Sequence, residues 1–256
     1  MTSEDLAFAS GYDERQPVIV LLDTSESMGR PEESPRIDAL NAALGEWFEQ
    51  VRGEARLRAR VEVCLVSFDS QVRVYHPARR KLAPAGTADS AELFVAVGEM
   101  RPPRLEAGGF TCMGPAIETA LGLARERYEQ LRRERIPVRR PVIWLLTDGA
   151  PSDENGRALD EDELAPLAER LRAGENGGEC VFQAIGVRGA DRRLLQVLAP
   201  RGTSMLAELD FGQILDHLFT SSDRIDPARP ADETHDEIAR QAELRRKFLA
   251  MEEGWR

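Results

Sequence analysis

The sequence is poor in cysteine and histidine, the residues from which zinc sites are built. It contains three of each in 256 residues, and no two cysteines form a C-x-x-C motif. The histidines at positions 76, 217 and 235 do not have the spacing of zinc ligands, so we do not expect a zinc site. Cys64 and Cys180 lie in apolar, strand-like runs. We expect both to be buried free thiols.

The sequence also lacks long apolar runs and an excess of positive charge. No segment approaches the roughly 18 apolar residues of a membrane span, and the N-terminus has neither the basic segment nor the apolar run of a signal peptide. With 34 Lys and Arg against 45 Asp and Glu, the formal net charge is -11. Nucleic-acid binding requires a basic surface. We therefore expect a cytoplasmic protein whose partner is neither nucleic acid nor membrane.

Strand-like runs alternate with helix-like segments along most of the chain. Continuous apolar runs at 17–23 and 140–149 predict buried strands, and apolar residues recur at helical spacing in 34–55 and 111–135. The segment 60–77 predicts an antiparallel hairpin. Later helices are expected at 160–174, 191–199 and 211–222, and strands at 180–187 and 204–209. This order predicts an α/β fold with a doubly wound, mostly parallel, Rossmann-like central sheet and helices on both faces.

The two ends of the chain differ in composition from its middle. We expect an N-terminal extension at 1–15, one domain at 16–223, and a charged linker with a C-terminal helix at 224–256. The last helix would carry an apolar stripe on one face, formed by Leu244, Phe248, Met251 and Trp255. Either the protein's own domain or a partner surface could cover this stripe, and the sequence leaves both alternatives open.

Small oxygen-bearing side chains follow two of the predicted strands. Asp23, Ser25 and Ser27 follow the first strand, and Asp148 ends the later strand at 140–149. A Gly-Gly loop brings Thr111 to the start of a helix. In open α/β sheets ligands bind beyond the carboxyl ends of the strands, and carboxylate and hydroxyl oxygens suit Mg²⁺ or Mn²⁺. Turn formation and helix capping are the alternative explanation for these residues taken singly.

The ordered set D-x-S-x-S, Gly-Gly-x-Thr and T-D-G resembles the von Willebrand factor A (vWA) domain with its metal-ion-dependent adhesion site. The resemblance spans roughly residues 16–222. It implies that Asp23, Ser25, Ser27, Thr111 and Asp148 form the metal site. It further implies that the serines bind the cation directly, the aspartates often through water, and the threonine either way. One coordination position is then left for an acidic side chain of a protein partner or for solvent.

Among vWA domains the sequence is most similar to the bacterial tellurium-resistance Y type, through "VIVLLDTSESM", "RVEVCLVSFDS", "APSD" and "FGQILDHLF". That similarity implies a role in a bacterial stress or defence system with kinase, phosphatase or ATPase components as partners. Glu26 departs from the family, which often has Gly at this position. Its carboxylate could reach the cation or face water, and the general exposure of Glu favours water.

The sequence favours a binding module over an enzyme. A phosphatase of the aspartyl-phosphate type needs a second Asp two residues after the first, where this chain has Ser25. Neither a G-x-S-x-G elbow nor a phosphate-binding Walker motif is present. The alternatives are an adaptor subunit of an AAA+ ATPase and, less well supported, a Mg²⁺-dependent phosphohydrolase.

Arginines are concentrated between positions 125 and 140, where glutamates alternate with them. They lie around the C-terminal end of a predicted helix, where positive charge is favourable. We interpret the cluster as a solvated face rather than a docking site for an acidic partner. Its members are Arg125, Arg127, Arg132, Arg133, Arg135, Arg139 and Arg140.

Overall fold

The continuous apolar runs of the sequence form the strands of the central sheet. The computed structural model describes residues 14–205, 211–224 and 233–240. The strands are β1 (Gln16–Asp23), β2 (Val61–Phe68), β3 (Val72–His76), β4 (Lys81–Pro84), β5 (Val95–Ala96), β6 (Val142–Thr147), β7 (Val181–Gly186) and β8 (Thr203–Met205). Every residue of β1, β2, β6 and β7 is buried, as expected for parallel strands that are covered on both faces.

Within the described residues the sheet has eight strands in the order β4-β3-β2-β1-β6-β7-β8, and β5 pairs with β2. The strands β2, β1, β6, β7 and β8 pair in parallel, whereas β3, β4 and β5 are antiparallel to their neighbours. The predicted α/β class and the hairpin of β2 and β3 are therefore confirmed. Leu22 lies opposite both Ser67 of β2 and Leu146 of β6, so these strands end at the same edge of the sheet.

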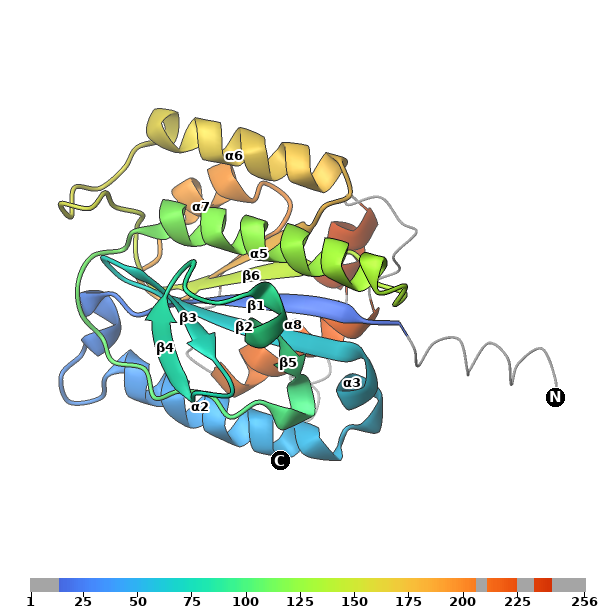
Figure 1. The fold of residues 1–256 in the computed structure, drawn as a ribbon. Helices are drawn as coiled ribbons and strands as arrows, with labels where there is room; N and C mark the ends of the chain where they lie inside the picture. The colour runs from blue at the N-terminus through green and yellow to red at the C-terminus, as the bar shows by residue number, and fades with distance from the viewer. Residues whose placement is uncertain (1–13, 206–210, 225–232, 241–256) are drawn as a thin grey trace, which may run out of the picture.

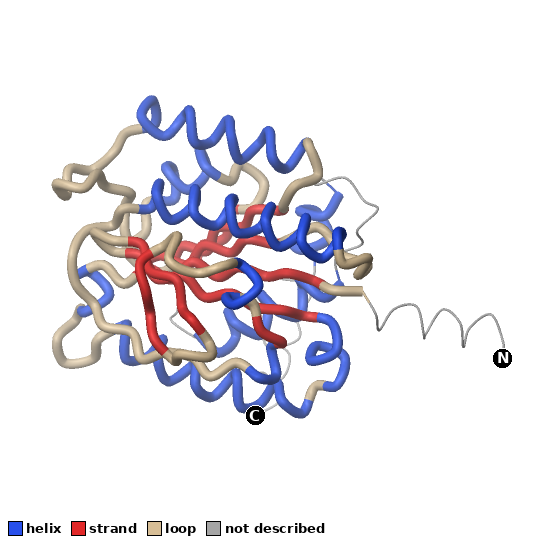
Figure 2. The backbone as a smooth tube through the Cα atoms, in the orientation of Figure 1, coloured by secondary structure: helices blue, strands red, loops and turns tan. Residues whose placement is uncertain are grey.

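Helices cover both faces of the sheet (Figures 1 and 2). One face packs against α2 (Arg36–Gln50), α3 (Ala55–Arg60) and α8 (Phe211–Arg224), and the other against α5 (Met113–Arg133), α6 (Glu161–Asn176) and α7 (Arg192–Leu198). The short elements are η1 (Glu26–Gly29), η2 (Val51–Gly53), α4 (Ser90–Leu93) and η3 (Val97–Glu99). The structure therefore has three layers, with the sheet in the middle.

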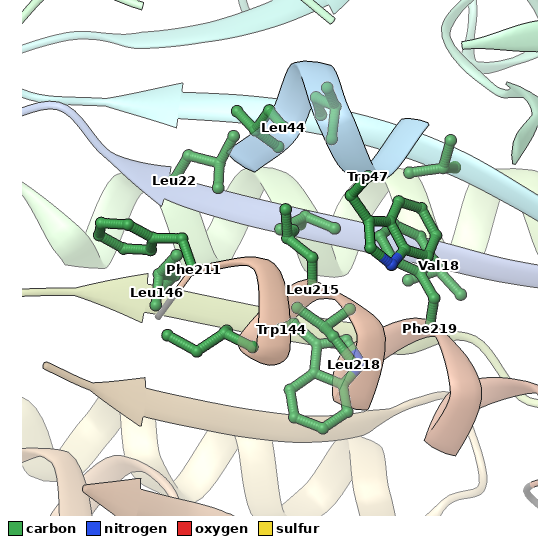
Figure 3. Packing of buried hydrophobic residues seen from close by; sticks show 14 of the residues in the cluster. Val18, Leu22, Leu44, Trp47, Trp144, Leu146, Phe211, Leu215, Leu218 and Phe219 are labelled. Atoms are coloured by element: carbon green, nitrogen blue, oxygen red, sulfur yellow. The ribbon is translucent and has the colours of Figure 1, made fainter. Parts of the chain in front are cut away.

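Alternation of side chains along each strand divides the core into two clusters. In β1, Val18 and Leu22 point toward α2 and α8, whereas Ile19 and Leu21 point toward α5. Figure 3 shows the first cluster, in which aromatic rings of α2 and α8 pack over β1 and β6. Trp47 and Phe219 stack there, with ring centroids 4.2 Å apart and an interplanar angle of 17°. This packing holds the C-terminal part of α2 and α8 against the sheet.

Several elements differ from the sequence predictions. The single helix expected over 34–55 is divided in the structure: α2 ends at Gln50, the 3-10 turn η2 follows, and α3 begins at Ala55. The backbone of Glu54 is not helical and separates η2 from α3. Gly53, a poor helix former, ends the 3-10 turn at the same place. The strands β4 and β5 were not predicted, since they are short and lie in a Pro- and Gly-rich stretch.

The arginine cluster is not uniformly solvated, contrary to our interpretation of the sequence. Only 11% of the Arg127 side chain is exposed, and its Nε and Nη2 donate to Glu62 Oε2 over 2.8 and 2.6 Å. Arg139 pairs with Glu14 over 2.6 Å. Both arginines are drawn inward because each meets a carboxylate at the amino-terminal edge of the sheet.

Residues 233–240 are helical and fold back on their own domain. Gln183 Nε2 donates to Nδ1 of the buried His235 (2.7 Å), and His235 Nε2 donates to Glu175 Oε1 (2.8 Å). Ile238 is also buried. The predicted stripe from Leu244 to Trp255 and the extension 1–13 lie outside the described residues. Of the helices that the structure describes, none is both long and apolar enough to cross a membrane.

Candidate metal centre

The end of β1 and the end of β6 place two aspartates at one edge of the sheet. β1 and β6 are adjacent and parallel, so the loops that follow them leave the sheet side by side. Asp23 is the last residue of β1, and Asp148 comes directly after β6. The loop before α5 brings Thr111 to the same edge. The carboxyl ends of the strands thus form the concave edge where ligands bind in open α/β sheets.

Asp23 is fully buried at the base of this edge. Its Oδ1 accepts a hydrogen bond from the Ser25 amide (2.8 Å), and its Oδ2 accepts one from Thr147 Oγ1 (2.5 Å). Burial raises the pKa of the Asp23 carboxyl from 3.8 to about 6, although these hydrogen bonds lower it. No Lys, Arg or His within the described residues forms an ion pair with Asp23. The structure therefore holds a buried acid without a counter-charge.

The side chains of Ser25, Ser27 and Asp148 form a chain of oxygens next to Asp23. Ser25 Oγ and Ser27 Oγ are 3.1 Å apart, and Ser27 Oγ donates to Asp148 Oδ1 over 2.5 Å. The 3-10 turn η1, which begins at Glu26, directs both serines to the same side. Three oxygen-bearing side chains from two loops thus meet at one point.

Thr111 completes the group from the third loop. Its backbone is fixed by Ser152, whose Oγ accepts from the Thr111 amide (3.0 Å) and whose amide donates to the Thr111 carbonyl (2.9 Å). The Thr111 hydroxyl itself makes no hydrogen bond with the described residues. A Cβ on Gly149 would lie 3.0 Å from Thr111 Oγ1 and 3.6 Å from Ser27 Oγ. Glycine at 149 therefore leaves space between these hydroxyls.

Arg36 is the residue of this edge that sequence analysis missed. Its Nη1 donates to Asp148 Oδ2 over 2.7 Å and to the Ser27 carbonyl over 3.2 Å. Only 17% of the Arg36 side chain is exposed, and the Asp148 side chain is fully buried. An arginine in the first turn of a helix is common on protein surfaces, so the sequence contained no signal for this ion pair.

Glu26 faces solvent rather than the cluster. About two thirds of its side chain is exposed (69%), and its Oε1 accepts from Arg30 Nη2 over 2.8 Å. The extra carboxylate in the first loop thus forms a surface ion pair.

Ser152 and Asp153 stabilise the turns after β6. Ser152 holds the Thr111 backbone, and Asp153 accepts hydrogen bonds from the amides of Asn155 and Arg157.

The donor set consists of two carboxylates and three hydroxyls. Within the described residues, no three or more His, Cys, Asp and Glu side chains form a group that could hold a metal. Oxygen donors of this kind suit Mg²⁺ or Mn²⁺. The uncompensated Asp23, the unpaired Thr111 hydroxyl and the space beside Gly149 all fit a small cation at this edge.

The sequence from residue 18 to residue 150 matches the model of the von Willebrand factor type A domain. The chain belongs to this family. vWA domains are modules for metal-dependent protein interaction and are typically not enzymes. The matched segment runs from β1 through the loop after β6 and so contains all five residues of the candidate centre.

Solved structures share the vWA fold at low sequence identity. A von Willebrand factor type A protein from Catenulispora acidiphila superposes with a TM-score of 0.51 at 20% identity, over 82% of this chain and 43% of that one. The pilus adhesin SpaC from Lactobacillus rhamnosus GG superposes with a TM-score of 0.54 at 15% identity, over 82% of this chain and 31% of the adhesin. Proximal thread matrix protein 1 from the mussel byssus superposes with a TM-score of 0.51 at 16% identity, over 81% of this chain and 48% of that protein. This vWA chain spans less than half the length of each. No curated protein sequence gives a significant match.

Proposed function

We propose that this vWA domain binds one Mg²⁺ or Mn²⁺ through Asp23, Ser25, Ser27, Thr111 and Asp148, and that the bound ion recruits a protein partner. The observation that carries the proposal is Asp23, a fully buried carboxyl that no cationic side chain among the described residues compensates. A buried acid of this kind is costly unless a counter-charge is supplied. The adjacent hydroxyls of Ser25 and Ser27 supply the remaining oxygens.

Each residue of the centre has a distinct expected role. By resemblance to the family, Ser25 and Ser27 bind the ion directly, Asp23 and Asp148 act mainly through water, and Thr111 acts either way. The ion contributes a positive charge with an open coordination position, which an acidic side chain of the partner can fill. Mg²⁺ keeps several waters in proteins, so an incomplete set of protein ligands is suitable for it.

The biological setting is proposed from the resemblance to the tellurium-resistance Y type. It points to a cytoplasmic role in a bacterial stress or defence system, with kinase, phosphatase or ATPase components as partners and neither nucleic acid nor membrane. We propose a binding module rather than an enzyme, because Ser25 stands where an aspartyl-phosphate phosphatase needs its second Asp. The alternatives are an AAA+ ATPase adaptor and a Mg²⁺-dependent phosphohydrolase.

Titration calorimetry tests the metal site directly. We expect one Mg²⁺ or Mn²⁺ site in the wild type, and loss of binding in Asp23→Asn and Asp148→Asn. Asp153→Asn is the matched control, because it removes a carboxylate from the same loop without altering the centre. Binding of wild-type strength in both variants of the centre would place the site elsewhere.

A pull-down in Mg²⁺ and in chelator tests the partner. Recovery of the same partner only in Mg²⁺ supports the proposal, and the identity of that partner separates a kinase or phosphatase system from an AAA+ ATPase. A phosphatase assay with Asp23→Asn as control tests the phosphohydrolase alternative, which requires turnover that this variant loses.

A further inference from the structure

An open pocket lined with arginines lies beside the candidate metal centre. Its volume is about 690 Å³, and its lining residues are Arg30, Pro31, Glu32, Arg36 and Arg188. These residues come from the loop before α2, the first turn of α2 and the segment after β7. Three positive side chains thus converge on one pocket of a chain whose net charge is -11. The five residues of the metal centre do not line this pocket.

Arg36 joins the pocket to the metal centre. It lines the pocket and also donates through Nη1 to Asp148 Oδ2. Its Nε is buried and has no hydrogen-bond partner. A guanidinium has five N–H donors in a planar fork, so one edge of Arg36 is used by Asp148 while other donors remain available. Arg36 lines the pocket, so a carboxylate bound there would lie beside a guanidinium that is not fully hydrogen-bonded within the described residues.

Arg188 and Arg30 are free to turn toward a ligand. Arg188 is exposed and forms no hydrogen bond or ion pair within the part of the chain that the structure describes. Within the described ranges the one ion pair of Arg30 is with Glu26, and both side chains are 69% exposed. Exposed pairs of this kind contribute little, so a stronger acceptor can displace Glu26. Both arginines therefore remain available for a ligand.

We propose that this arginine pocket binds a second carboxylate of an acidic peptide segment whose first carboxylate reaches the metal ion. The inference rests on the proposed function, since it assigns the partner's chemistry at the same edge. Arginine binds carboxylates through paired hydrogen bonds, and Arg36 spans the distance between the two positions. The partner is thus a protein segment with two acidic side chains rather than one. Nucleic acid is disfavoured by the acidic surface of the rest of the chain.

The test measures binding of a fluorescein-labelled peptide, GEGEGEG, and of its glutamine counterpart, GQGQGQG, by fluorescence anisotropy in saturating Mg²⁺. We expect Arg188→Gln to weaken binding of the glutamate peptide about tenfold, because a charge-assisted hydrogen bond is lost. Arg125→Gln, which removes an exposed arginine from α5, is the matched control and should bind as the wild type does. The glutamine peptide should not distinguish these proteins.

Calorimetry with Mg²⁺ on the same proteins separates this inference from the proposed function. Within the described residues Arg188 forms no hydrogen bond or ion pair with the five residues of the centre, so Arg188→Gln should keep the Mg²⁺ affinity of the wild type. If Mg²⁺ binds but Arg188→Gln binds the glutamate peptide like the wild type, or if no peptide binds, the pocket assignment is wrong and the metal site stands. If no Mg²⁺ binds but peptide affinity still depends on Arg188, the metal site is wrong and the pocket stands. Tighter, Arg188-dependent binding of an oligothymidylate would assign the pocket to nucleic acid and overturn the proposal.

Discussion

The two edges of the parallel sheet each hold a buried carboxylate, and the two carboxylates differ in whether a positive charge compensates them. At the amino-terminal edge, Glu62 accepts two hydrogen bonds from Arg127 over 2.8 and 2.6 Å and lies 3.7 Å from Arg15 Nε. At the carboxyl-terminal edge, Asp23 is buried more completely, and its partners among the described residues are hydroxyl and amide donors. Asp148, beside it, pairs with one cation of the described chain, Arg36. Glu62 is balanced in charge, whereas Asp23 has no cationic partner among the described residues.

This difference separates a structural carboxylate from a functional one. Glu62 and its arginines satisfy one another, so nothing further needs to bind there. Asp23 lowers stability when ionised, because its charge is desolvated without compensation. A group that costs stability and sits where ligands bind is a candidate for function. The deficit of positive charge, rather than the presence of acids, distinguishes the candidate metal centre.

Breaking the balanced edge should have the largest effect. We expect Arg127→Ala to lower the free energy of unfolding by about 3 kcal/mol, because it leaves Glu62 buried with only the more distant Arg15. Urea denaturation measures this change. Arg125→Ala, an exposed arginine on the same helix, should change stability by less than about 0.5 kcal/mol. Equal effects in the two variants would show that the Glu62 pair is not a structural ion pair.

The unbalanced edge should make the metal-free protein sensitive to pH. Burial raises the pKa of Asp23 in the folded state to about 6, above the unfolded value of 3.8. The folded state therefore binds more protons between these values, and stability falls as the pH rises from about 4 through about 6. The full loss is about 3 kcal/mol at about 1.4 kcal/mol per pKa unit.

Denaturant titrations in chelator at several pH values measure this loss. The comparison is with Asp23→Asn, which keeps the shape of the side chain and cannot ionise. As the pH rises, we expect the free energy of unfolding of the wild type to fall relative to that of the variant. A difference that is flat from pH 4 to pH 7 would contradict the raised pKa.

Removing Arg36 should sharpen the contrast between the edges. We expect Arg36→Gln to destabilise the metal-free protein by about 1–2 kcal/mol, because Asp148 loses its only ion-pair partner among the described residues. The same change should strengthen Mg²⁺ binding about tenfold, since a nearby positive charge is removed. Denaturation in chelator and calorimetry with Mg²⁺ measure the two effects. Weaker Mg²⁺ binding would instead make Arg36 a necessary support of the centre.

Ser27→Ala should have the smallest effect on stability. Ser27 lies in a half-buried turn, and the hydrogen bonds of its hydroxyl to described residues are with Ser25 and Asp148. We expect a change below about 1 kcal/mol, while Mg²⁺ binding is lost. Leu44→Ala, in the core of α2, is the reference and should cost about 3 kcal/mol or more. Thermal or urea unfolding compares them. If Ser27→Ala lowers the free energy of unfolding as much as Leu44→Ala does, Ser27 is a structural cap rather than a metal ligand.

The sequence predicted the fold class, and the five side chains that it singled out lie at one edge of the sheet. It could do so because continuous apolar runs end directly in Asp23 and Thr147, and adjacent parallel strands end together. It could not predict Arg36 or the burial of Arg127. The ion pair of Arg127 joins residues 65 positions apart, and that of Arg36 joins residues 112 apart. Such pairs depend on how α2 and α5 pack, which no local pattern contains.

The ion pair of Arg36 with Asp148 has a consequence for the order of events after synthesis. Zinc fingers cannot fold until their metal arrives, because their ligands have no other counter-charge and little core. Here Arg36 occupies one acid of the centre, and the two core clusters are complete without any ion. The newly made chain can therefore fold without an ion. In the function proposed above, the cation would bind to the folded domain in a reversible step, set by the free concentration of the ion rather than by the folding of the chain.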